Sequence, residues 1–430
     1  MNSVLPAGKE RNEFRSTEDT RGLTMQTALA RELCEEFLED VYALPHGEKL
    51  KQCLQCGTCS ASCLSGAAME FGPREIIASL RAGMLDRVLN AKTVWLCVSC
   101  YSCAVRCPAG IPLTDVMYEL KRLEVDKGLA KDAAGETMAH AFAETVDRYG
   151  RNAETTLLRK YFLRTNPWHA LAQIPLAIRL FFRGRLEILP RKIKGLDSLH
   201  KMLAAIEQNG RELATVCNAC YVVLRKTNKY MAEDSHLRDD IRQALQAGGM
   251  DYSGNVRVRH FLEILVNDIG EARIRSRVQR DMSGWKVACY CGCQLSRPFD
   301  DLDHPEYPRL MERLVEWLGA AVVPFPLAAK CCGGMAMTTH PETGQVLTGK
   351  ILKVASQRGA GCVATACPLC PINLEAYQDK VGRAVGACCQ IPVLYFTQLM
   401  GIAFGLPPVE LALNDNLTSL EPLLGEKVTS

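Results

Sequence analysis

Two identically spaced cysteine runs near the N-terminus constrain the fold of this chain more than any other feature. Each run has the spacing C-x2-C-x2-C-x3-C, which is a spacing by which proteins hold [4Fe–4S] clusters. In such a pair of runs, three close thiolates bind three corners of one cube and the fourth thiolate reaches the neighbouring cube. The expected ligand sets are Cys53, Cys56, Cys59 and Cys107 for one cluster, and Cys97, Cys100, Cys103 and Cys63 for the other.

Structural zinc is the alternative interpretation of these runs. Zinc rarely uses eight cysteines in two identically spaced runs, so the iron–sulfur interpretation is favoured. Pro108 follows the second run, as in ferredoxins, whereas Leu64 stands at the corresponding position of the first run. This departure removes no ligand. The runs therefore predict two ferredoxin-type clusters.

The cysteine content also indicates a compartment. The chain has 21 cysteines, and cysteine-rich chains are usually either secreted and disulfide-bonded or intracellular and metal-bound. The start of the chain is polar and charged, without the apolar core of a signal peptide, and no run of about 18 uncharged apolar residues follows. We therefore expect a cytoplasmic protein. The formal net charge of +3 gives no reason to expect a nucleic-acid partner.

The segment that carries the two runs is predicted to be helical. Residues 1–25 are polar and are expected to form a disordered tail. Pro73 stands at a plausible first helical position with Gly83 as a stop, and 112–124 again has a helical pattern. Nothing in this part has the alternation of a strand. We expect an all-α ferredoxin domain with two [4Fe–4S] clusters over 26–135.

A basic segment over 136–205 is expected to form a helical extension. Between Arg159 and Lys194 there are nine basic residues and one acid. Apolar residues such as Ile174 and Ile178 lie close to helical spacing. One interpretation is a basic amphipathic helix that docks on an acidic partner or a membrane surface. The other is an ordinary surface helix packed on its own domain.

The last part of the chain, 206–430, changes to an α/β pattern. Short apolar runs with β-branched residues predict strands, and helical stretches lie between them. This alternation indicates parallel strands, so the fold class expected for the whole chain is multidomain α and α/β. The expected strands are 286–290, 321–325 and 362–366, and the expected helices are 307–319 and 343–357.

Five cysteines directly follow these predicted strands. The carboxyl ends of parallel strands meet at one edge of a sheet, which is where open α/β sheets build their sites. We therefore expect five thiolates to converge, and Gly333 and Gly334 would let the backbone approach an inorganic cluster closely. The alternative is buried structural cysteine or zinc. The five residues are Cys293, Cys331, Cys332, Cys367 and Cys370.

A further Cys-x2-Cys pair lies earlier in the same region. Segment 214–224 is identical to segment 364–374 at five of eleven positions, including both cysteines, so the region looks like two related halves. No cysteine lies between Cys107 and Cys217. The first half therefore keeps only Cys217 and Cys220. These could be a free dithiol, a redox pair or half of a zinc site, or they could hold a second cluster if other cysteines such as Cys388, Cys389 or Cys289 complete it.

These motifs and their surroundings resemble heterodisulfide reductase. The N-terminal part is similar to the C-type subunit of that family in CLQCGTCSASC, FGPREIIASLRAG and VWLCVSCYSCAVRCPAGIPLTDVM. The C-terminal part resembles the B-type subunit in VRVRHFLEIL, YCGCQLSRP, KCCGGMAM and ATACPLCPINL. The resemblance covers most of the chain, in the order of a C–B fusion. The paired runs are shared with other families, whereas the CCG motif with its partner cysteines is specific.

The resemblance implies a cofactor and an activity for the C-terminal part. In the family, five cysteines of a complete CCG set hold a noncubane [4Fe–4S] cluster, at which a disulfide is cleaved with electrons delivered one at a time. The B-type subunit normally carries two such sets, and this chain keeps one. The implied ligands of the noncubane cluster, which are also the implied catalytic residues, are Cys293, Cys331, Cys332, Cys367 and Cys370.

The expected function is that of an oxidoreductase acting on sulfur groups. As an iron–sulfur subunit of a heterodisulfide reductase-like complex, the chain would pass electrons through two [4Fe–4S] clusters to the noncubane cluster, which reduces or forms a disulfide. The sequence has no evident flavin site, so the expected electron partner is a flavin-containing subunit or a membrane cytochrome. Any membrane association is expected through a partner only.

Two other functions are compatible with parts of the sequence. The first is a non-catalytic electron-transfer subunit of a flavin-dependent glycolate or lactate oxidase-type dehydrogenase, and the segments FGPREII and WLCVSC favour the reductase over it. The second is a redox sensor or scaffold, which explains the eight cubane ligands poorly. In the reductase, Lys330 could attract an anionic substrate, and His304 or His340 could donate a proton to a leaving thiolate.

Overall fold

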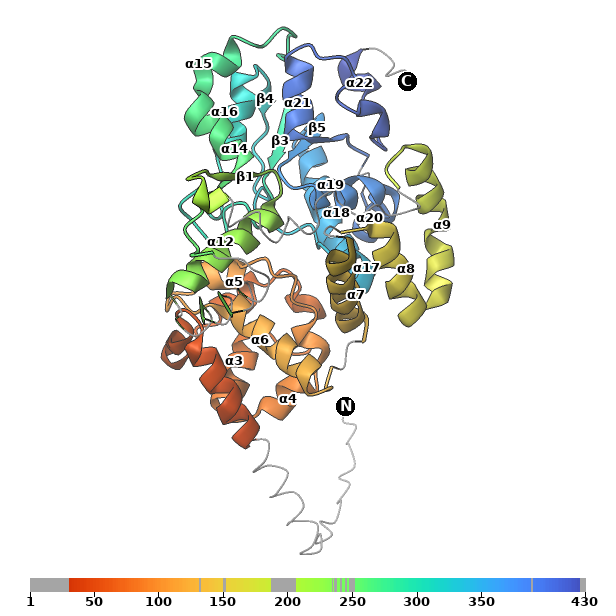
Figure 1. Ribbon diagram of the computed structural model, residues 1–430. Helices are drawn as coiled ribbons and strands as arrows, with labels where there is room; N and C mark the ends of the chain where they lie inside the picture. Colours follow the sequence, from red (N-terminus) through yellow and green to blue (C-terminus); the bar gives the residue numbers. More distant parts are fainter. Residues whose placement is uncertain are drawn as a thin grey trace, which may run out of the picture.

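The computed structural model has a helical N-terminal part at one end and an α/β C-terminal part at the other, with the helices of 133–182 along one side (Figure 1). The tail predicted over 1–25 lies outside the described residues. In the part of the chain that is described, no helix has both the length and the apolar character needed to cross a membrane. The structure describes residues 31–425 apart from 131–132, 150–151, 187–205, 388–389 and scattered positions within 234–251.

The described residues of the N-terminal part form helices and turns, which confirms the all-α prediction. A helix over 31–43 packs Phe37 against Ile76 and Leu80 of α3 in one buried core. Helix α3 begins at Pro73 as predicted. The Glu75 carboxylate accepts a hydrogen bond from the backbone N–H of Gly72, just before the helix. The elements are η1 (Gly47–Gln52), α2 (Thr58–Ser62), η2 (Gly66–Ala68), α3 (Pro73–Arg81), α4 (Leu85–Leu89), η3 (Lys92–Val94), α5 (Ser102–Val105) and α6 (Leu113–Asp126).

Three helices form the middle of the chain, and the third corresponds to the predicted basic amphipathic helix. They are α7 (Ala133–Tyr149), α8 (Glu154–Arg164) and α9 (Pro167–Phe182). Helix α9 is held on the C-terminal part by arginines at its end. Arg179 donates to the backbone carbonyl of Leu417 at 2.7 Å, and Arg183 donates to that of Asn414. The basic side chains therefore bind this chain's own backbone.

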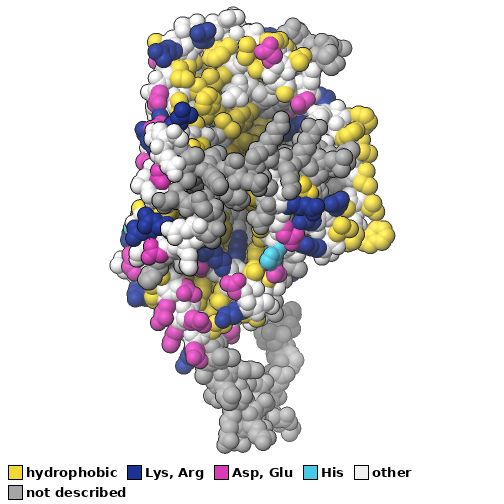
Figure 2. All heavy atoms as spheres, viewed as in Figure 1, with side chains coloured by type: hydrophobic (Ala, Val, Ile, Leu, Met, Phe, Trp, Pro, Cys, Tyr) yellow, Lys and Arg dark blue, Asp and Glu magenta, His cyan; other side chains and the backbone are white. Residues whose placement is uncertain are grey.

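Several large apolar side chains of α9 are exposed. Trp168 is 78% exposed, Ile178 is 51% exposed and Phe182 is 81% exposed. Figure 2 shows apolar side chains along the edge of the molecule where α9 lies in Figure 1. The interpretation of a surface helix packed on its own domain is confirmed, and docking on an acidic partner or a membrane surface stays a prediction. The helix packs on its own domain through partly buried residues such as Ala170, Leu176 and Leu180, with two arginines bonded to backbone carbonyls, and much of its exposed surface is apolar.

The C-terminal part contains a four-stranded parallel sheet with the strand order β4-β3-β5-β6. Strand β3 spans the predicted residues, whereas β4 and β5 end earlier than predicted. Strand β5 is buried along its whole length, as expected for a parallel sheet that is covered on both faces. The strands are β3 (Lys286–Tyr290), β4 (Ala321–Val322), β5 (Cys362–Thr365) and β6 (Val393–Tyr395).

Helices connect these strands and cover the sheet. The predicted helices at 307–319 and 343–357 are present as α16 and α18, with shifted ends. The helical elements are α14 (Phe261–Ile264), the π-helical turn η4 (Leu265–Ile269), α15 (Gly270–Arg275), α16 (Leu310–Trp317), α17 (Ala336–Thr339), α18 (Pro341–Gln357), α19 (Leu369–Ala376), α20 (Gln378–Val385), α21 (Phe396–Ala403), η5 (Leu413–Asp415) and α22 (Glu421–Leu424).

A second, two-stranded parallel sheet confirms that the C-terminal region repeats a unit. Strand β1 (Leu213–Thr215) leads through a Cys-x2-Cys pair into α12 (Asn218–Glu233), and β2 (Val258–His260) pairs beside β1. Strand β5 likewise leads through a Cys-x2-Cys pair into a helix, and β6 pairs beside it. In both sheets, the second strand runs directly into a helix that begins with Phe.

Candidate metal centre

The first set of N-terminal cysteines lines one small cavity. Three of them come from the loop before α2 and from its first turn, where Gly57 has a φ of +81°, a conformation that glycine adopts without steric cost. The fourth comes from the turn after α5. Four thiols around one cavity are the donor set of an iron–sulfur cube, so the residues present fit such a group. They are Cys53, Cys56, Cys59 and Cys107.

The second set lies close together in the same part of the molecule. Burial raises the pKa of Cys103, and the nearby thiols Cys97, Cys100 and Cys63 add to this effect. Burial likewise raises the pKa of Cys63, with Cys97 close by. The last cysteine of the first run thus lies with the second run, and Cys107 lies with the first. This is the crossing that the spacing predicted, and the ligand assignment itself stays a prediction.

The five cysteines of the C-terminal part converge at one edge of the four-stranded sheet, as their positions after the strands predicted. The sulfur atoms of Cys332 and Cys370 are 3.6 Å apart. Cys331 lies within hydrogen-bonding reach of both Cys293 and Cys332, and Cys370 within reach of Cys367. The hydrogen bond from Cys331 lowers the pKa of Cys293 in spite of its burial. The five thiols therefore form an unbroken row, and their role as ligands stays a prediction.

Two polar side chains that sequence reasoning missed hold the CC pair in place. Thr348 Oγ1 donates to the carbonyl of Cys332 at 2.7 Å, and Asn373 Nδ2 donates to the same carbonyl at 3.2 Å. Gly333 follows with a φ of +90°, and a Cβ there would lie 3.0 Å from the Cα of Gly344. Only glycine fits this position, which explains one of the two predicted glycines.

The second N-terminal set lies against the C-terminal set. Burial raises the pKa of Cys100 to about 11, and the nearby thiol of Cys293 adds to this shift. Arg297, which is 1% exposed, donates from Nε to the carbonyl of Cys293 at 3.2 Å and from a terminal nitrogen to the Ser102 hydroxyl. The three sets of cysteines therefore follow one another through the molecule.

Two ion pairs hold the two parts together beside this junction. Lys226 of α12 pairs with Asp115 of α6, and both side chains are 18% exposed. Arg106, just after α5, pairs with Glu306. Partly buried pairs are screened by salt less than surface pairs are, so they help to fix the distance between the second and third cysteine sets.

Comparison with known proteins identifies two domains. Residues 49–111 match the 4Fe-4S dicluster domain, and residues 287–375 match the cysteine-rich domain CCG. The chain is 33% identical over 214 residues to the B-type subunit of the Ferredoxin/F(420)H(2)-dependent CoB-CoM heterodisulfide reductase of Methanosarcina acetivorans, a match that covers 49% of this chain and 71% of that protein. The chain belongs to the heterodisulfide reductase family.

Two other relatives extend the comparison. The C-type subunit of the Ferredoxin:CoB-CoM heterodisulfide reductase of Methanosarcina mazei is 41% identical over 99 residues, 23% of this chain and 60% of that protein. The 8-methylmenaquinol:fumarate reductase membrane anchor subunit of Wolinella succinogenes is 34% identical over 217 residues, 50% of this chain and 75% of that protein. The predicted fusion of C-type and B-type parts is confirmed, and the glycolate or lactate oxidase alternative gains no support.

The shortened half of this heterodisulfide reductase family member places its Cys-x2-Cys pair beside the complete set. Hydrogen bonds from Cys220 and Cys367 lower the pKa of Cys217, while the same contact with Cys217 raises the pKa of Cys220. Cys217 is partly buried and Cys220 is exposed. The sequence did not indicate where this pair lies. In the structure it lies beside Cys367, at the end of the row of thiols.

The other polar residues singled out in the sequence have different surroundings. Burial lowers the pKa of Lys330, which lies near Arg106 and Arg297 at the junction of the two parts. His304 is exposed, and its Nδ1 accepts hydrogen bonds from two backbone N–H groups of its own loop. The Nδ1 of His340 lies 3.0 Å from the hydroxyl of the preceding threonine. No described contact places either histidine ring against a cysteine.

The cysteines without a predicted role are mostly structural. Cys34 is buried and donates from Sγ to the carbonyl of Leu80 at 3.4 Å. Cys289, Cys291 and Cys362 are buried in the core beside the four-stranded sheet. Cys388 and Cys389 lie outside the described residues.

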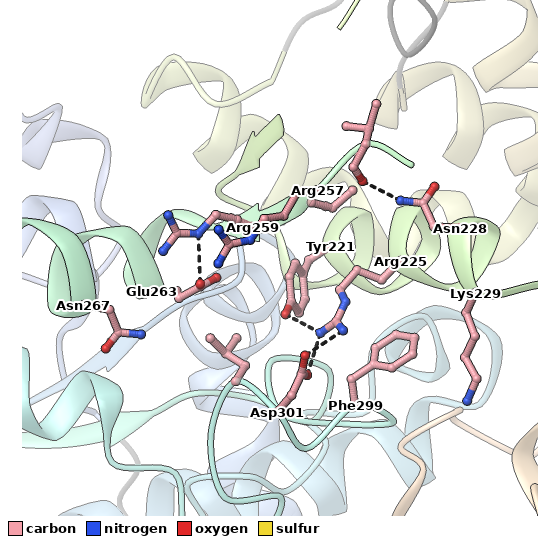
Figure 3. A pocket seen from close by; sticks show the side chains of 13 residues that line it. Tyr221, Arg225, Asn228, Lys229, Arg257, Arg259, Glu263, Asn267, Phe299 and Asp301 are labelled. Atoms are coloured by element: carbon pink, nitrogen blue, oxygen red, sulfur yellow. Dashed lines mark hydrogen bonds and ion pairs between the residues drawn. The ribbon is translucent and has the colours of Figure 1, made fainter. Parts of the chain in front are cut away.

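A cavity of about 450 Å³ lies between α12, β2 and the loop after β3 (Figure 3). Its arginines have partners: Arg225 forms two hydrogen bonds with Asp301, and Arg259 pairs with Glu263. The described residues that line it include no cysteine. This cavity is therefore separate from the thiol row.

Among the described residues, no three His, Cys, Asp or Glu side chains converge tightly enough to hold a single metal ion. A tetrahedral zinc site requires four ligand atoms about 2.0–2.3 Å from one ion. In a [4Fe–4S] cube each thiolate binds a different iron, so the sulfur atoms stand farther apart.

Proposed function

We propose that this chain is the iron–sulfur subunit of a heterodisulfide reductase-like complex, which passes electrons through two [4Fe–4S] clusters to a noncubane cluster where a disulfide is reduced or formed. One observation carries the proposal. Arg297 bridges the Cys293 carbonyl and the Ser102 hydroxyl, which in turn contacts the Cys100 sulfur, and so joins the ferredoxin-type cysteines to the CCG cysteines in one row. A conduit that ends at a reactive centre needs this continuity.

The proposed ligands follow the three sets in the row. When bound, these groups would supply one-electron transfer steps and, at the CCG set, a place for a substrate sulfur atom. The first cube would be held by Cys53, Cys56, Cys59 and Cys107, the second by Cys63, Cys97, Cys100 and Cys103, and the noncubane cluster by Cys293, Cys331, Cys332, Cys367 and Cys370.

The protein's own residues prepare the CCG site for this chemistry. Cys331 and Cys332 are each 4% exposed, so the loop around them excludes water from the thiolates. Asn373 and Thr348 hold that loop in one conformation. Arg297 adds a positive charge beside the thiolates, which makes the addition of an electron easier. These residues position the ligands and set the local field.

The first cysteine set is the proposed place where electrons enter. Cys56 is exposed, and the neighbouring Leu54 is 71% exposed although it is a large apolar residue. Such a residue beside a redox centre suits a contact with another subunit. The proposed partner is a flavin-containing subunit or a membrane cytochrome.

A viologen-driven assay tests the proposal. The purified complex would be given reduced viologen and a panel of disulfides without oxygen. Cys331→Ser and Cys367→Ser should abolish disulfide reduction while the ferredoxin-type clusters stay reducible by dithionite. Cys34→Ser, which alters a buried cysteine of the N-terminal core that is outside the proposed ligand sets, is the matched control. Unchanged turnover in either CCG variant would favour a chain that only conducts electrons.

A second candidate function is favoured by the Wolinella succinogenes relative. That protein is named as a subunit of an 8-methylmenaquinol:fumarate reductase, and it is 34% identical over 217 residues. In this alternative, the same row of thiols carries electrons between a quinol and another subunit. Turnover with a menaquinol analogue, together with no turnover of any disulfide in the panel, would select it.

We further propose that the exposed face of α9 lies on a membrane surface. Its apolar stripe has Trp168 near the start and Phe182 at the end, and interfacial helices bury such residues at the level of the lipid headgroups. The Wolinella succinogenes relative is named as a membrane anchor subunit. The arginines that bind the C-terminal part keep this stripe turned outward.

A further inference from the structure

The two Cys-x2-Cys pairs of the C-terminal part meet at equivalent positions. Cys217 lies two residues after the end of β1, and Cys367 lies two residues after the end of β5. The two sulfur atoms lie within hydrogen-bonding reach of each other. Each is the first cysteine of its pair, so the repeat brings together the same position of both halves.

Residues at equivalent positions of the two halves frame this contact. His260 ends β2 and Tyr395 ends β6, and each is paired across its sheet with the corresponding threonine of the neighbouring strand. The Tyr395 hydroxyl donates to the carbonyl of Val216, before the first pair, and lies 3.2 Å from that of Ala366, before the second pair. The two pairs are therefore held by shared hydrogen bonds and not by chance proximity.

A second contact fixes the first pair on the CCG site. Asn218, which lies between Cys217 and Cys220, is 1% exposed and donates from Nδ2 to the carbonyl of Cys291 at 2.8 Å. Gly292, which follows Cys291, has a φ of +75°, and a Cβ there would lie 3.4 Å from that same Asn218 nitrogen. The start of α12 is thus bound closely to the loop that carries the CCG cysteines.

The two cysteines of the first pair face different surroundings. Cys217 is partly buried and turned toward Cys367, whereas Cys220 is exposed. Val216 is 50% exposed and Val223 is 63% exposed on the same short stretch of chain. One sulfur of the pair therefore contacts the proposed cluster site, and the other is accessible to a molecule from solution.

We propose that Cys217 and Cys220 form a redox-active dithiol–disulfide pair that connects the CCG site to the substrate. This inference rests on the proposed function and specifies its last step: the disulfide that the CCG site reduces is the one between Cys217 and Cys220, and this pair exchanges with the substrate. The pair stands where the second CCG set of a B-type part would end, but no cysteine lies between Cys107 and Cys217 to complete such a set. Two adjacent thiols in a Cys-x2-Cys turn form a disulfide readily.

The step is a thiol–disulfide exchange followed by a two-electron reduction. The Cys220 thiol passes its proton to Cys217, and its sulfur attacks a substrate disulfide, forms a mixed disulfide and releases the first product thiolate, which takes up that proton. Cys217 then attacks the Cys220 sulfur, releases the second product thiolate and closes the Cys217–Cys220 disulfide. Two electrons, delivered one at a time by a reduced one-electron carrier of the complex through the cysteine row, and two protons from solvent restore both thiols. The net change is one disulfide, two electrons and two protons converted to two thiols.

Mass spectrometry after differential alkylation tests this inference on the full chain. The protein is purified without oxygen, reduced with dithionite, freed of reductant and exposed to 2-hydroxyethyl disulfide before quenching. We expect a Cys217–Cys220 disulfide that disappears when dithionite is added again. In Cys217→Ser, the exposed Cys220 should instead retain a mercaptoethanol adduct, because no second thiol resolves it. Turnover of the probe should fall at least about tenfold in this variant.

Controls separate this inference from the proposed function. Iron content and dithionite bleaching are measured on the same samples, and Cys34→Ser should behave as the unaltered chain does. If iron and bleaching are normal but neither cysteine reacts with the probe, or if the disulfide formed joins Cys217 to Cys367, the inference is overturned and the proposed function stands. If the iron–sulfur chromophores are absent, the proposed function itself fails.

Discussion

Arg297 is the largest fully buried side chain in the described part of the protein. A buried guanidinium is costly unless its charge and its donors are used. Here it donates to the carbonyl of Cys293 and to the hydroxyl of Ser102, so it links the CCG loop to the ferredoxin-type part. Its buried Nη2 has no hydrogen-bond partner among the described residues. The charge is thus held between two sets of thiolates, which it stabilises.

Removing this charge should make the neighbouring centres harder to reduce. Arg297→Met keeps most of the side-chain volume, and we expect reduction potentials that are more negative, by on the order of 100 mV for one charge at close range. Arg297→Lys is the matched control because it keeps the charge and alters the hydrogen bonds. A redox titration followed by electron paramagnetic resonance gives the potentials. Equal potentials in the two variants would contradict an electrostatic role.

His260 predicts a dependence of stability on pH. Burial lowers the pKa of this histidine to about 4, an effect that the nearby Cys217 partly opposes. The unfolded chain therefore takes up a proton near pH 6.5 that the folded chain resists until about pH 4. The stability of the folded state is therefore at its full value above about pH 6.5. It falls by up to about 3 kcal/mol as the pH drops to about 4.

His260→Asn should reduce this loss of stability in acid. Nδ1 of His260 accepts the backbone N–H of Leu262 at the start of α14, and asparagine can accept the same bond without titrating. Thermal unfolding at about pH 7.5 and about pH 5 gives the comparison. The difference between the two conditions should be smaller in the variant. An equal difference in both proteins would show that other groups control the acid sensitivity.

At the residue scale, the cysteine ligands that stand in motifs of fixed spacing could be predicted from the sequence. The residues that act through contacts formed only on folding could not. The cubane cysteines and Cys331–Cys332 stand in local motifs, so the sequence alone indicates their partners. Arg297, Thr348 and Asn373 act through contacts between segments far apart in the chain, and no local pattern marks them. The signals that pointed toward Arg297 and Asn373 are the quoted segments YCGCQLSRP and ATACPLCPINL, in which they lie.

At the scale of elements, α9 shows what periodicity can and cannot predict. Apolar spacing correctly predicted a helix over this segment, because one face of a helix collects every third or fourth residue. Which face meets the protein depends on tertiary contacts, here the bonds of Arg179 and Arg183 to backbone carbonyls. The same limit applies to β4, whose pairing with β3 covers only part of the apolar run that predicted it.

Polar substitutions on α9 should weaken membrane binding. Replacing both Ile178 and Phe182 by serine removes two large apolar side chains from the exposed stripe, so affinity for vesicles should fall by about 3 kcal/mol, roughly a hundredfold. Flotation with vesicles of phosphatidylcholine and phosphatidylglycerol measures this. Val409→Ser is the control, because Val409 is 67% exposed but lies outside α9. Equal flotation of both variants, or no flotation of the unaltered chain, would contradict a membrane surface as the occupant.

At the scale of the whole molecule, the two parts are arranged so that three cysteine sets follow one another. The fold class and the order of the parts could be predicted, because cysteine runs, apolar strands and helix stops are local signals. The junction could not, since it depends on contacts such as Lys226 with Asp115. The contact of Cys217 with Cys367 was likewise outside the reach of sequence, although the internal repeat had indicated related positions.

The order of the row predicts distinct effects for cysteines of the two ferredoxin-type sets. Cys56→Ser should remove the first centre, and Cys100→Ser the second. Either change should stop electron delivery to the CCG site while that site keeps its own spectroscopic signal. Freeze-quenched electron paramagnetic resonance after addition of a donor follows each centre. A variant that loses the CCG signal but keeps both cubane signals would show that the assignment of sets to parts is wrong.

The central claim is that three iron–sulfur centres lie in a row in one chain, and an iron count tests it most directly. The chain is purified without oxygen, and iron, acid-labile sulfide and zinc are measured against protein by amino-acid analysis. Two cubes and one noncubane cluster predict about 12 iron atoms per chain, with little zinc. About 8 iron atoms per chain, or a preparation in which zinc dominates, would contradict the account.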